Sequence, residues 1–484
     1  MLAFLRLFFL LLAFLVSRVV LAESAEPSPH EEDEFDLMNI LAKEGLHDLD
    51  NERWNLYGQM TWIQQQQSGF NAPYTNLNGS PNSLRPFSAS TYTVTSTLYF
   101  GLKLWDGGEI YVAPEAISSL PLSELKGLGS TIQNFELQKN GSMTPRLYNS
   151  RSYFKQTFGF GGETQQVESD PMQLGAKVDA RRLSLTVGEF SVLDFFDKNA
   201  YSGDLRRQFF NMAFLTYAAY DFAADARGYT FGANAQFFWD DWAFRFGRVA
   251  APIDPNQQYL NYDIFEYYGD QIEIEHAHTL FGQPGVVRVL GFRNQENMGR
   301  FSDAISAYQS DKSKNAASCT SFNYGSANST APDLCWVRRP NIKMGIGINL
   351  EQKITDDIGV FFRGMYNDGQ TEVYSYTSTD RSIALGGIAK GTLWDRERDS
   401  FGLGYAQGWI SREHAQYLSM GGIDGFIGDG ALSWASEHVM DVFYSLNIVS
   451  PVWFTADFQF IANPAYNSAR GPLEVYGGRV HIEF

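Results

Sequence analysis

Apolar and polar residues alternate strictly in many short segments of this chain. In residues 341–350, Ile342 and its alternate neighbours are apolar, whereas Lys343 and Asn349 belong to the intervening polar set. Because successive side chains of a β-strand point to opposite faces, each such segment predicts a strand with one apolar and one polar face. Residues 229–239 show the same pattern, with Tyr229 and the other rings on the apolar face.

Sixteen segments follow this pattern, joined alternately by tight turns and by long polar loops. This asymmetry is typical of a membrane β-barrel, whereas a soluble sandwich does not sort its connections by length. Both chain ends are expected in the periplasm, which requires an even number of strands. We therefore predict a closed antiparallel transmembrane β-barrel of 16 strands. Residues 172–179 could form a further strand, but adding it alone would break the parity, so we assign them to a periplasmic connection and keep 18 strands as the alternative. The predicted strands are residues 54–64, 92–105, 109–115, 147–160, 182–190, 229–239, 242–249, 271–281, 286–294, 341–354, 358–366, 383–394, 401–410, 440–449, 452–462 and 476–484.

The last strand, from Tyr476 to Phe484, ends on an aromatic residue at the carboxy-terminus. Tyr476, Val480 and Phe484 share one face, and Arg479 and His481 lie on the other. The outer-membrane barrel assembly machinery reads such a strand, so this machinery is a predicted partner. In a closed barrel the segment must pair with the first strand, because closure leaves no free sheet edge.

Composition narrows the class of protein. The 37 Lys and Arg against 55 Asp and Glu give a net charge of −18, and the pI is near 4.8, so nucleic acid is excluded as a partner. Aromatic residues make up 15% of the chain and there are 44 Gly, which fits many short strands and turns. With a mean hydropathy of −0.25 and no internal apolar run of about 18 residues, transmembrane helices are not expected in the mature chain.

The amino-terminal region predicts export. Arg6 precedes an apolar stretch at residues 7–16, and Ala22 ends a sequence suited to cleavage, so residues 1–22 are a predicted signal peptide. Residues 23–50 are acidic and predict either a periplasmic segment with a short amphipathic helix or a mobile tail. Residues 51–484 are the predicted barrel domain, which spans the outer membrane of a Gram-negative cell many times.

Two cysteines, Cys319 and Cys335, lie 16 positions apart in a stretch rich in Ser, Asn and Gly. In an exported protein this arrangement predicts a disulfide that closes a surface loop. A loop of that length would be stabilised by about 3 kcal/mol. Two thiols without a nearby His make a poor zinc site, so no metal is expected.

The polar strand faces line the predicted pore if the apolar faces contact lipid. This parity places Arg182, Arg245, Lys343 and Arg363 inside the barrel. Arginine offers a planar fork of donors to vicinal hydroxyls or to carboxylates, so these residues are candidate substrate contacts. For each of them, an ordinary solvated position in the pore is the alternative.

Residues 191–228, after the fifth predicted strand, are too aromatic for a solvated extracellular loop. We predict that they fold inward as a constriction, where aromatic faces can stack on sugar rings and Asp and Arg can bind hydroxyls. A loop packed on the inner wall for structure alone is the alternative. The candidate substrate contacts in this loop are Asp194, Phe195, Phe196, Asp197, Tyr201, Asp204, Arg206, Arg207 and Arg227.

Four blocks of the sequence resemble those of the carbohydrate-selective porin family. The resemblance covers residues 54–484 and implies a substrate-selective sugar channel in a Gram-negative outer membrane. The acidic segment at residues 23–50 and the cysteine loop depart from the simplest members of the family. The blocks are FFDKNAYSGDLRRQFFN, DARGYTFG, GFRNQENMGRFSDAI and NPAYNSARGP, which start at Phe195, Asp225, Gly291 and Asn463.

These observations together predict an outer-membrane porin for passive, partly selective diffusion of carbohydrates. Its expected partners are outer-membrane lipid, lipopolysaccharide and small carbohydrate solutes, and either a monomer or a trimer fits the sequence. A channel for organic acids or cations is the main alternative. A hydrolase built on the barrel is a weaker one, because the sequence has no G-x-S-x-G or H-E-x-x-H motif. We therefore expect no enzymatic activity and no cofactor.

Overall fold

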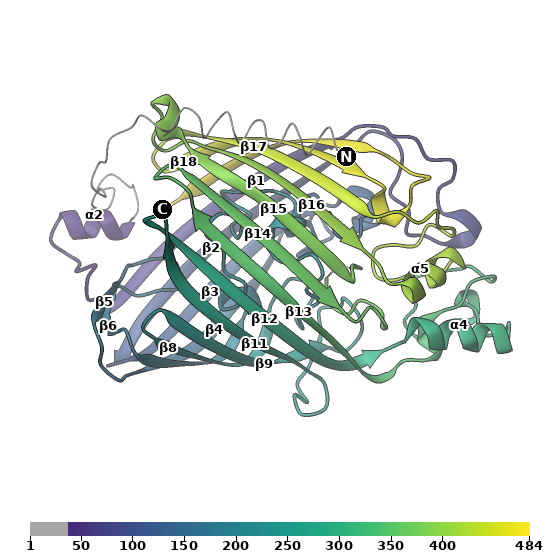
Figure 1. Cartoon of the computed structure of the whole chain (residues 1–484), viewed down its shortest axis with the longest axis horizontal. Helices are drawn as coiled ribbons and strands as arrows, with labels where there is room; N and C mark the ends of the chain where they lie inside the picture. Colours follow the sequence, from purple (N-terminus) through teal and green to yellow (C-terminus); the bar gives the residue numbers. More distant parts are fainter. Residues whose placement is uncertain (1–36, 377) are drawn as a thin grey trace. The chain divides into compact units, whose positions relative to one another are not determined.

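Antiparallel hydrogen bonding joins sixteen strands into one closed ring in the computed structural model of the chain (Figure 1). The structure describes residues 37–376 and 378–484. The chain divides into two units, Met1–Glu34 and Phe35–Phe484, and the ring belongs to the second. The predicted signal peptide and the acidic residues 23–36 lie outside the described residues.

The ring runs through the strands in chain order and closes between the last and the first. The predicted 16-stranded closed barrel is thereby confirmed. The strands of the ring are β1 (Trp54–Gln67), β2 (Ala89–Trp105), β3 (Gly108–Leu120), β4 (Arg146–Gly159), β7 (Arg182–Phe190), β8 (Thr230–Trp239), β9 (Trp242–Pro252), β11 (Tyr268–Leu280), β12 (Gln283–Met298), β13 (Arg339–Lys353), β14 (Ile358–Asn367), β15 (Arg381–Lys390), β16 (Ser400–Trp409), β17 (Glu437–Val449), β18 (Val452–Ala462) and β19 (Leu473–Glu483).

Three further strands in the described part of the chain lie outside the ring. The short β10 (Leu260–Asn261) pairs with the end of β9, and β5 (Thr164–Val167) pairs with β6 (Ala176–Asp179) as a separate two-stranded sheet. Residues 172–179 therefore contribute β6 to the connection between β4 and β7 and add no strand to the barrel, as predicted.

Closure is made by β19 against β1. Met60 faces Ile482 and Trp62 faces Val480 in the antiparallel register, as the sequence predicted for the two terminal strands. The carboxy-terminal residue extends this pairing, because the amide of Phe484 donates to the carbonyl of Gly58 at 2.9 Å. Closure leaves no long sheet edge exposed to another chain.

Strand parity separates the two faces of the wall. On β13, Met344 and Ile346 are exposed on the outer surface, while Lys343 and Asn349 are buried inside. Apolar outer side chains of this kind are suited to contact with lipid. The closed ring is also suited to a membrane, because its backbone polar groups are paired within the sheet. One sequence assignment is wrong at its end: Tyr229 precedes β8 and is buried in the interior, whereas Phe231 is exposed outside.

Within residues 37–376 and 378–484, the helices are short and lie before the first strand or in the connections between strands. No helix among the described residues is long and apolar enough to cross a membrane. The α-helices are α2 (Leu37–Lys43), α3 (Met212–Leu215), α4 (Phe301–Ser310) and α5 (Arg412–Ser419). The 3-10 helices are η2 (Leu77–Gly79), η3 (Leu122–Leu125), η4 (Phe135–Gln138), η5 (Val192–Asp194), η6 (Ala316–Ser318), η7 (Leu334–Trp336), η8 (Gly391–Trp394) and η9 (Pro464–Tyr466).

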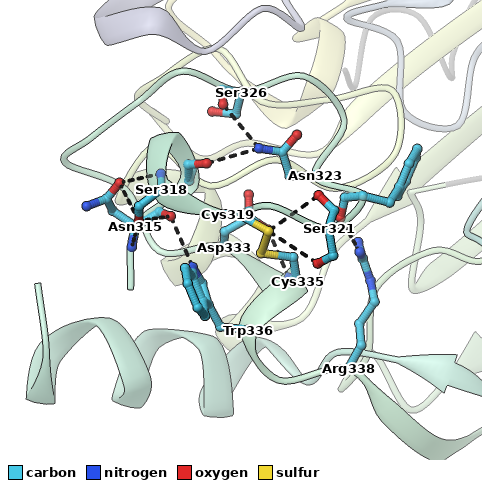
Figure 2. Close-up of a disulfide and its surroundings, with 12 residues drawn as sticks. Asn315, Ser318, Cys319, Ser321, Asn323, Ser326, Asp333, Cys335, Trp336 and Arg338 are labelled. Atoms are coloured by element: carbon cyan, nitrogen blue, oxygen red, sulfur yellow. Dashed lines mark hydrogen bonds between the residues drawn. A yellow bond between two sulfur atoms is a disulfide. The ribbon is translucent and has the colours of Figure 1, made fainter. Parts of the chain in front are cut away.

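The long loops form a second packed region at one rim, which includes α4 and α5 (Figure 1). Phe301, Tyr417 and Leu334 are buried there. In the loop between β12 and β13, Cys319 and Cys335 are joined by a disulfide, shown in Figure 2. Trp336 beside it donates its indole N–H to the carbonyl of Asn315 at 3.0 Å.

Candidate constriction site

The 191–229 loop, which joins β7 to β8, lies inside the barrel. It is bound by Arg151 on β4, Arg363 on β14 and Arg479 on β19. Because these strands stand far apart around the ring, a loop that reaches all three must cross the interior. Its buried rings are Phe195, Phe196, Phe209, Phe210, Phe214, Tyr217, Tyr220, Phe222 and Tyr229.

Asp197 is the main attachment of this loop to the wall. Arg363 donates from Nε to Asp197 Oδ1 at 3.0 Å and from Nη1 to the carbonyl of Phe214 at 2.9 Å. Thr216 donates its hydroxyl to the other carboxylate oxygen of Asp197 at 2.7 Å. The side chains of Arg363 and Asp197 are only 1% and 0% exposed, so the pair holds the loop and is closed to a passing solute.

Lys343 on β13 makes a second closed attachment. Its Nζ lies 2.9 Å from Oδ2 of Asp221, and the amides of Tyr374 and Ser375 each donate to the same carboxylate at 2.8 Å. Residues 374–376, in the connection between β14 and β15, are therefore drawn into the barrel together with the 191–229 loop. The ring of Tyr376 stacks on Phe222 with centroids 4.6 Å apart.

Arg245 on β9 is likewise fully engaged in ion pairs that stabilise the fold. Its Nη1 lies 2.9 Å from Glu273 and 3.0 Å from Glu275, both on the adjacent strand β11. Glu273 also accepts the amide of Asp197 at 2.8 Å. The wall and the loop are thus joined by one network of buried charges, whose members satisfy one another.

A third loop, residues 121–145 between β3 and β4, meets the 191–229 loop inside the barrel. The amide of Met212 donates to the carbonyl of Ile132 at 2.9 Å. The side-chain amides of Gln65 on β1 and Gln459 on β18 both donate to the carbonyl of Gln133, each at 3.0 Å. The 191–229 loop is therefore bound by both of the other inward loops. A solute can contact only those side chains that remain partly exposed.

Partly exposed charges gather between these loops and the wall formed by β2, β3 and β4. Arg206 of the 191–229 loop donates to Tyr99 Oη at 3.0 Å, to Glu115 at 3.2 Å and to Glu136 at 3.3 Å. Its side chain is 20% exposed, although Glu115 and Glu136 are fully buried. Lys139 also binds Glu115, at 3.0 Å, so this carboxylate is shared by two cations.

Two more arginines continue this set. Arg151 on β4 makes a bidentate pair with Asp194 of the loop, at 2.6 and 2.8 Å, with side chains 17% and 21% exposed. Burial raises the pKa of the Asp194 carboxyl, but Arg151 outweighs burial and holds that pKa below its ordinary value. Arg227 lies 4.5 Å above the ring of Tyr148, and Arg151 lies 5.3 Å from the ring of Tyr229.

We call this set the arginine cluster: Arg151, Arg206 and Arg227 with Tyr148, Tyr229, Glu115 and Asp194. It combines forked N–H donors, carboxylate acceptors and aromatic faces within one partly open region. Such a combination can bind a solute that carries several hydroxyls, because each hydroxyl is both donor and acceptor. The ring faces can pack against the apolar face of a sugar ring.

The other predicted contacts are placed differently. Arg182 lies near the short-turn rim and donates to Gln165 and to the carbonyl of Asp179, away from the 191–229 loop. Arg207 lies over Trp453 and binds Glu483 at 3.3 Å. Asp204 is exposed and caps the amides of Arg206 and Arg207. Phe195 and Phe196 are buried, and the ring of Tyr201 lies directly over Gly359.

Sequence reasoning missed most of the wall side of the arginine cluster. Arg151 and Tyr148 lie on a predicted strand, but a bulge between Ala113 and Pro114 shifts the register of β3 against β4 and obscures their parity. For Glu115, the sequence indicated only that it is the last residue of a predicted strand. The inward course of the 121–145 loop was also missed, although its apolar residues Ile132, Phe135 and Leu137 could have indicated it.

Comparisons with known proteins agree with this architecture. The model of a family described as "Carbohydrate-selective porin, OprB family" matches residues 82–484. The chain is similar to the structure of OprB from Pseudomonas putida, with 14% identity, a TM-score of 0.61 and coverage of 89% of this chain and 94% of that one. The channel DcaP of Acinetobacter baumannii is more distant, at 8% identity and a TM-score of 0.47, with coverage of 89% and 97%. No curated protein matches the chain.

Proposed function

This chain belongs to the OprB family of carbohydrate-selective porins, and we propose that its selectivity for sugars resides in the arginine cluster. The protein is a Gram-negative outer-membrane porin through which carbohydrates diffuse, and both its family and its fold indicate a channel rather than an enzyme. The finer question is which side chains meet the solute.

The observation that carries the proposal is the difference in exposure between two sets of basic residues. Arg363, Lys343 and Arg245 are between 1% and 7% exposed and have all their charge engaged by loop or wall carboxylates. Arg206 is 20% exposed and Arg227 is 19% exposed. Only the second set has side chains that are partly open to a solute in the interior.

The chemistry of the cluster suits neutral polyols better than ions. Arg206 is already bound to Glu115 and Glu136, and Arg151 to Asp194, so positive and negative groups alternate along the site. A solute that carries charge of only one sign would be attracted by one of these groups and repelled by the next. A sugar hydroxyl can accept from the guanidinium and donate to the carboxylate, and it carries no desolvation cost of a full charge.

The test compares flux of a sugar with flux of a neutral ethylene glycol oligomer of similar size, in liposomes that contain the purified protein. We expect the unmodified protein to favour the sugar. Arg206→Ala should lower that preference by about tenfold, which corresponds to loss of a hydrogen bond to a charged group. Arg181→Ala is the matched control, because Arg181 pairs with Asp240 in an exposed position, 39% and 46% exposed.

Two results would contradict the proposal. An unchanged preference in Arg206→Ala would remove the arginine cluster from the selectivity site. Reversal potentials in planar bilayers that show strong anion or cation selection, together with no preference for sugar, would instead support a channel for organic acids or cations.

A further inference from the structure

A groove opens on the outer surface of the barrel across β12 to β16. Its volume is about 600 Å³, and the strands that form it lie side by side in Figure 1. Gly364 stands in the outward row between Ile348 on β13 and Ile383 on β15, and its lack of a side chain leaves room in the groove beside the ring of Phe362. Phe362 and Val289 extend the apolar lining on either side.

One end of the groove is polar and lies toward the rim of the long loops. Tyr366, Arg381 and Trp409 are direct neighbours on β14, β15 and β16. The guanidinium of Arg381 lies 4.8 Å from the centre of the Tyr366 ring. Arg381 is the first residue of β15 and follows the 368–380 loop, which places it at the membrane boundary on the side of the long loops.

Arg381 differs from the basic residues inside the barrel. It is exposed, and no carboxylate within residues 37–376 and 378–484 forms an ion pair with it. By contrast, Arg248, another outward-facing arginine, is held by Asp270 in a bidentate pair with both distances 2.7 Å. An unpaired cation between two aromatic residues at a membrane boundary is suited to an anionic lipid headgroup.

We propose that this groove binds lipid A, the phosphorylated glycolipid that anchors lipopolysaccharide in the outer leaflet. One acyl chain lies in the groove over Gly364, and a phosphate of the headgroup binds Arg381. The long loops of a porin face the cell exterior, so the Arg381 end of the groove is at the level of the outer leaflet. Each methylene of the acyl chain that packs against the apolar side chains lining the groove contributes to binding through dispersion contacts.

The experiment titrates the full mature protein in detergent with diphosphorylated lipid A and counts bound copies by native mass spectrometry. We expect one preferred copy. Arg381→Gln should weaken binding at least about fivefold, as for loss of one basic residue at a membrane surface, and Arg381→Lys should retain most of it. Gly364→Leu should also weaken binding by filling the groove, because the added side chain points outward between Ile348 and Ile383.

Two matched controls test whether the effect is local. Arg248→Gln removes an outward arginine that is already paired, and Ala233→Leu adds the same bulk at an exposed outward position on β8. Both should bind lipid A as the unmodified protein does, and a lipid A without phosphates should bind Arg381→Gln and the unmodified protein equally. All variants are first checked for folding by heat-modifiable migration in gels.

Three results would overturn the proposal. The first is equal binding by all variants. The second is equal binding of phosphatidylglycerol, which would show a general anionic-lipid surface. The third is a change of oligomeric state in Gly364→Leu or Arg381→Gln without any change in lipid binding, which would make the groove an interface between copies of the chain.

Discussion

Arg363 on β14 points into the barrel interior and donates from Nε to Oδ1 of Asp197 in the 191–229 loop, at 3.0 Å. The pair fixes the 191–229 loop to the wall, and both side chains are shielded from solvent. Asp197 adopts a φ of 55°, a left-handed conformation that Asn tolerates well. Asp197→Asn therefore removes the charge with little backbone effect.

We expect Asp197→Asn to loosen the loop while the barrel stays folded. An uncompensated buried arginine costs about 3–5 kcal/mol, so local opening of the loop becomes far more frequent. Single-channel recordings should show larger and noisier conductance, and hydrogen exchange should rise at residues 191–229. Asp240→Asn, which breaks the exposed pair with Arg181, should change neither, since such pairs contribute less than about 1 kcal/mol. Equal traces from both variants would contradict the anchoring role.

Tyr148 provides a test of ring stacking in the arginine cluster. It packs under Arg227 and donates its hydroxyl to Glu115. Tyr148→Phe keeps the ring, whereas Tyr148→Ala removes it, so sugar affinity measured by current block should fall roughly fivefold only in the second variant. If the Phe variant loses as much affinity as the Ala variant, the hydrogen bond to Glu115 and not the ring face is responsible.

His414 on α5 predicts a pH dependence of the long-loop region. Its Nδ1 lies 3.0 Å from Asp380 and its Nε2 lies 3.2 Å from Asp424, while the ring stacks on Phe301 at 4.2 Å. Burial lowers the pKa of His414, but the two carboxylates outweigh burial and raise that pKa to about 9. The folded loops therefore bind this proton more tightly than the unfolded chain, whose His has a pKa of about 6.5.

The sign of the effect follows from linkage. The stabilisation is fully present below about pH 6.5, declines between about pH 6.5 and 9, and is lost above about pH 9, with a total on the order of 3 kcal/mol. Hydrogen exchange in α4 and α5 should accelerate as the pH rises through this window, after correction for intrinsic exchange. His414→Gln should lack the added dependence. A flat profile in the unmodified protein would rule out a charged His414.

The disulfide predicts a local effect only. Cys319, which ends η6, and Cys335, which lies in η7, close a loop of 16 positions in the connection between β12 and β13 (Figure 2). Replacing both with Ser should destabilise that loop by about 3 kcal/mol, because the open chain has more conformations. Proteolysis within residues 316–336 should increase, whereas sugar flux should be unchanged. A change in flux would show that the loop contributes to the channel.

The alternation of apolar and polar residues along the chain was sufficient to predict the strands that form the wall of the barrel. The period of two is a local property, so β7 was placed at its observed bounds, and the pairing of Tyr476 to Phe484 with the first strand followed from closure alone. The same parity assigned Lys343, Arg245 and Arg363 to the interior, where the structure has them. Aromatic content also indicated that the 191–229 segment needs an apolar environment.

The partners of those interior charges were decided only by tertiary structure. Arg363 and Asp197 are 166 positions apart, and Arg206 and Glu115 are 91 apart, so each pair depends on ring closure, strand register and the course of a loop. Sequence alone placed buried anchors such as Asp197 in the same class as partly exposed residues such as Arg206. Burial separates them, because a charge that is fully paired and shielded from water stabilises the fold, and only one with atoms still open to water can meet a solute.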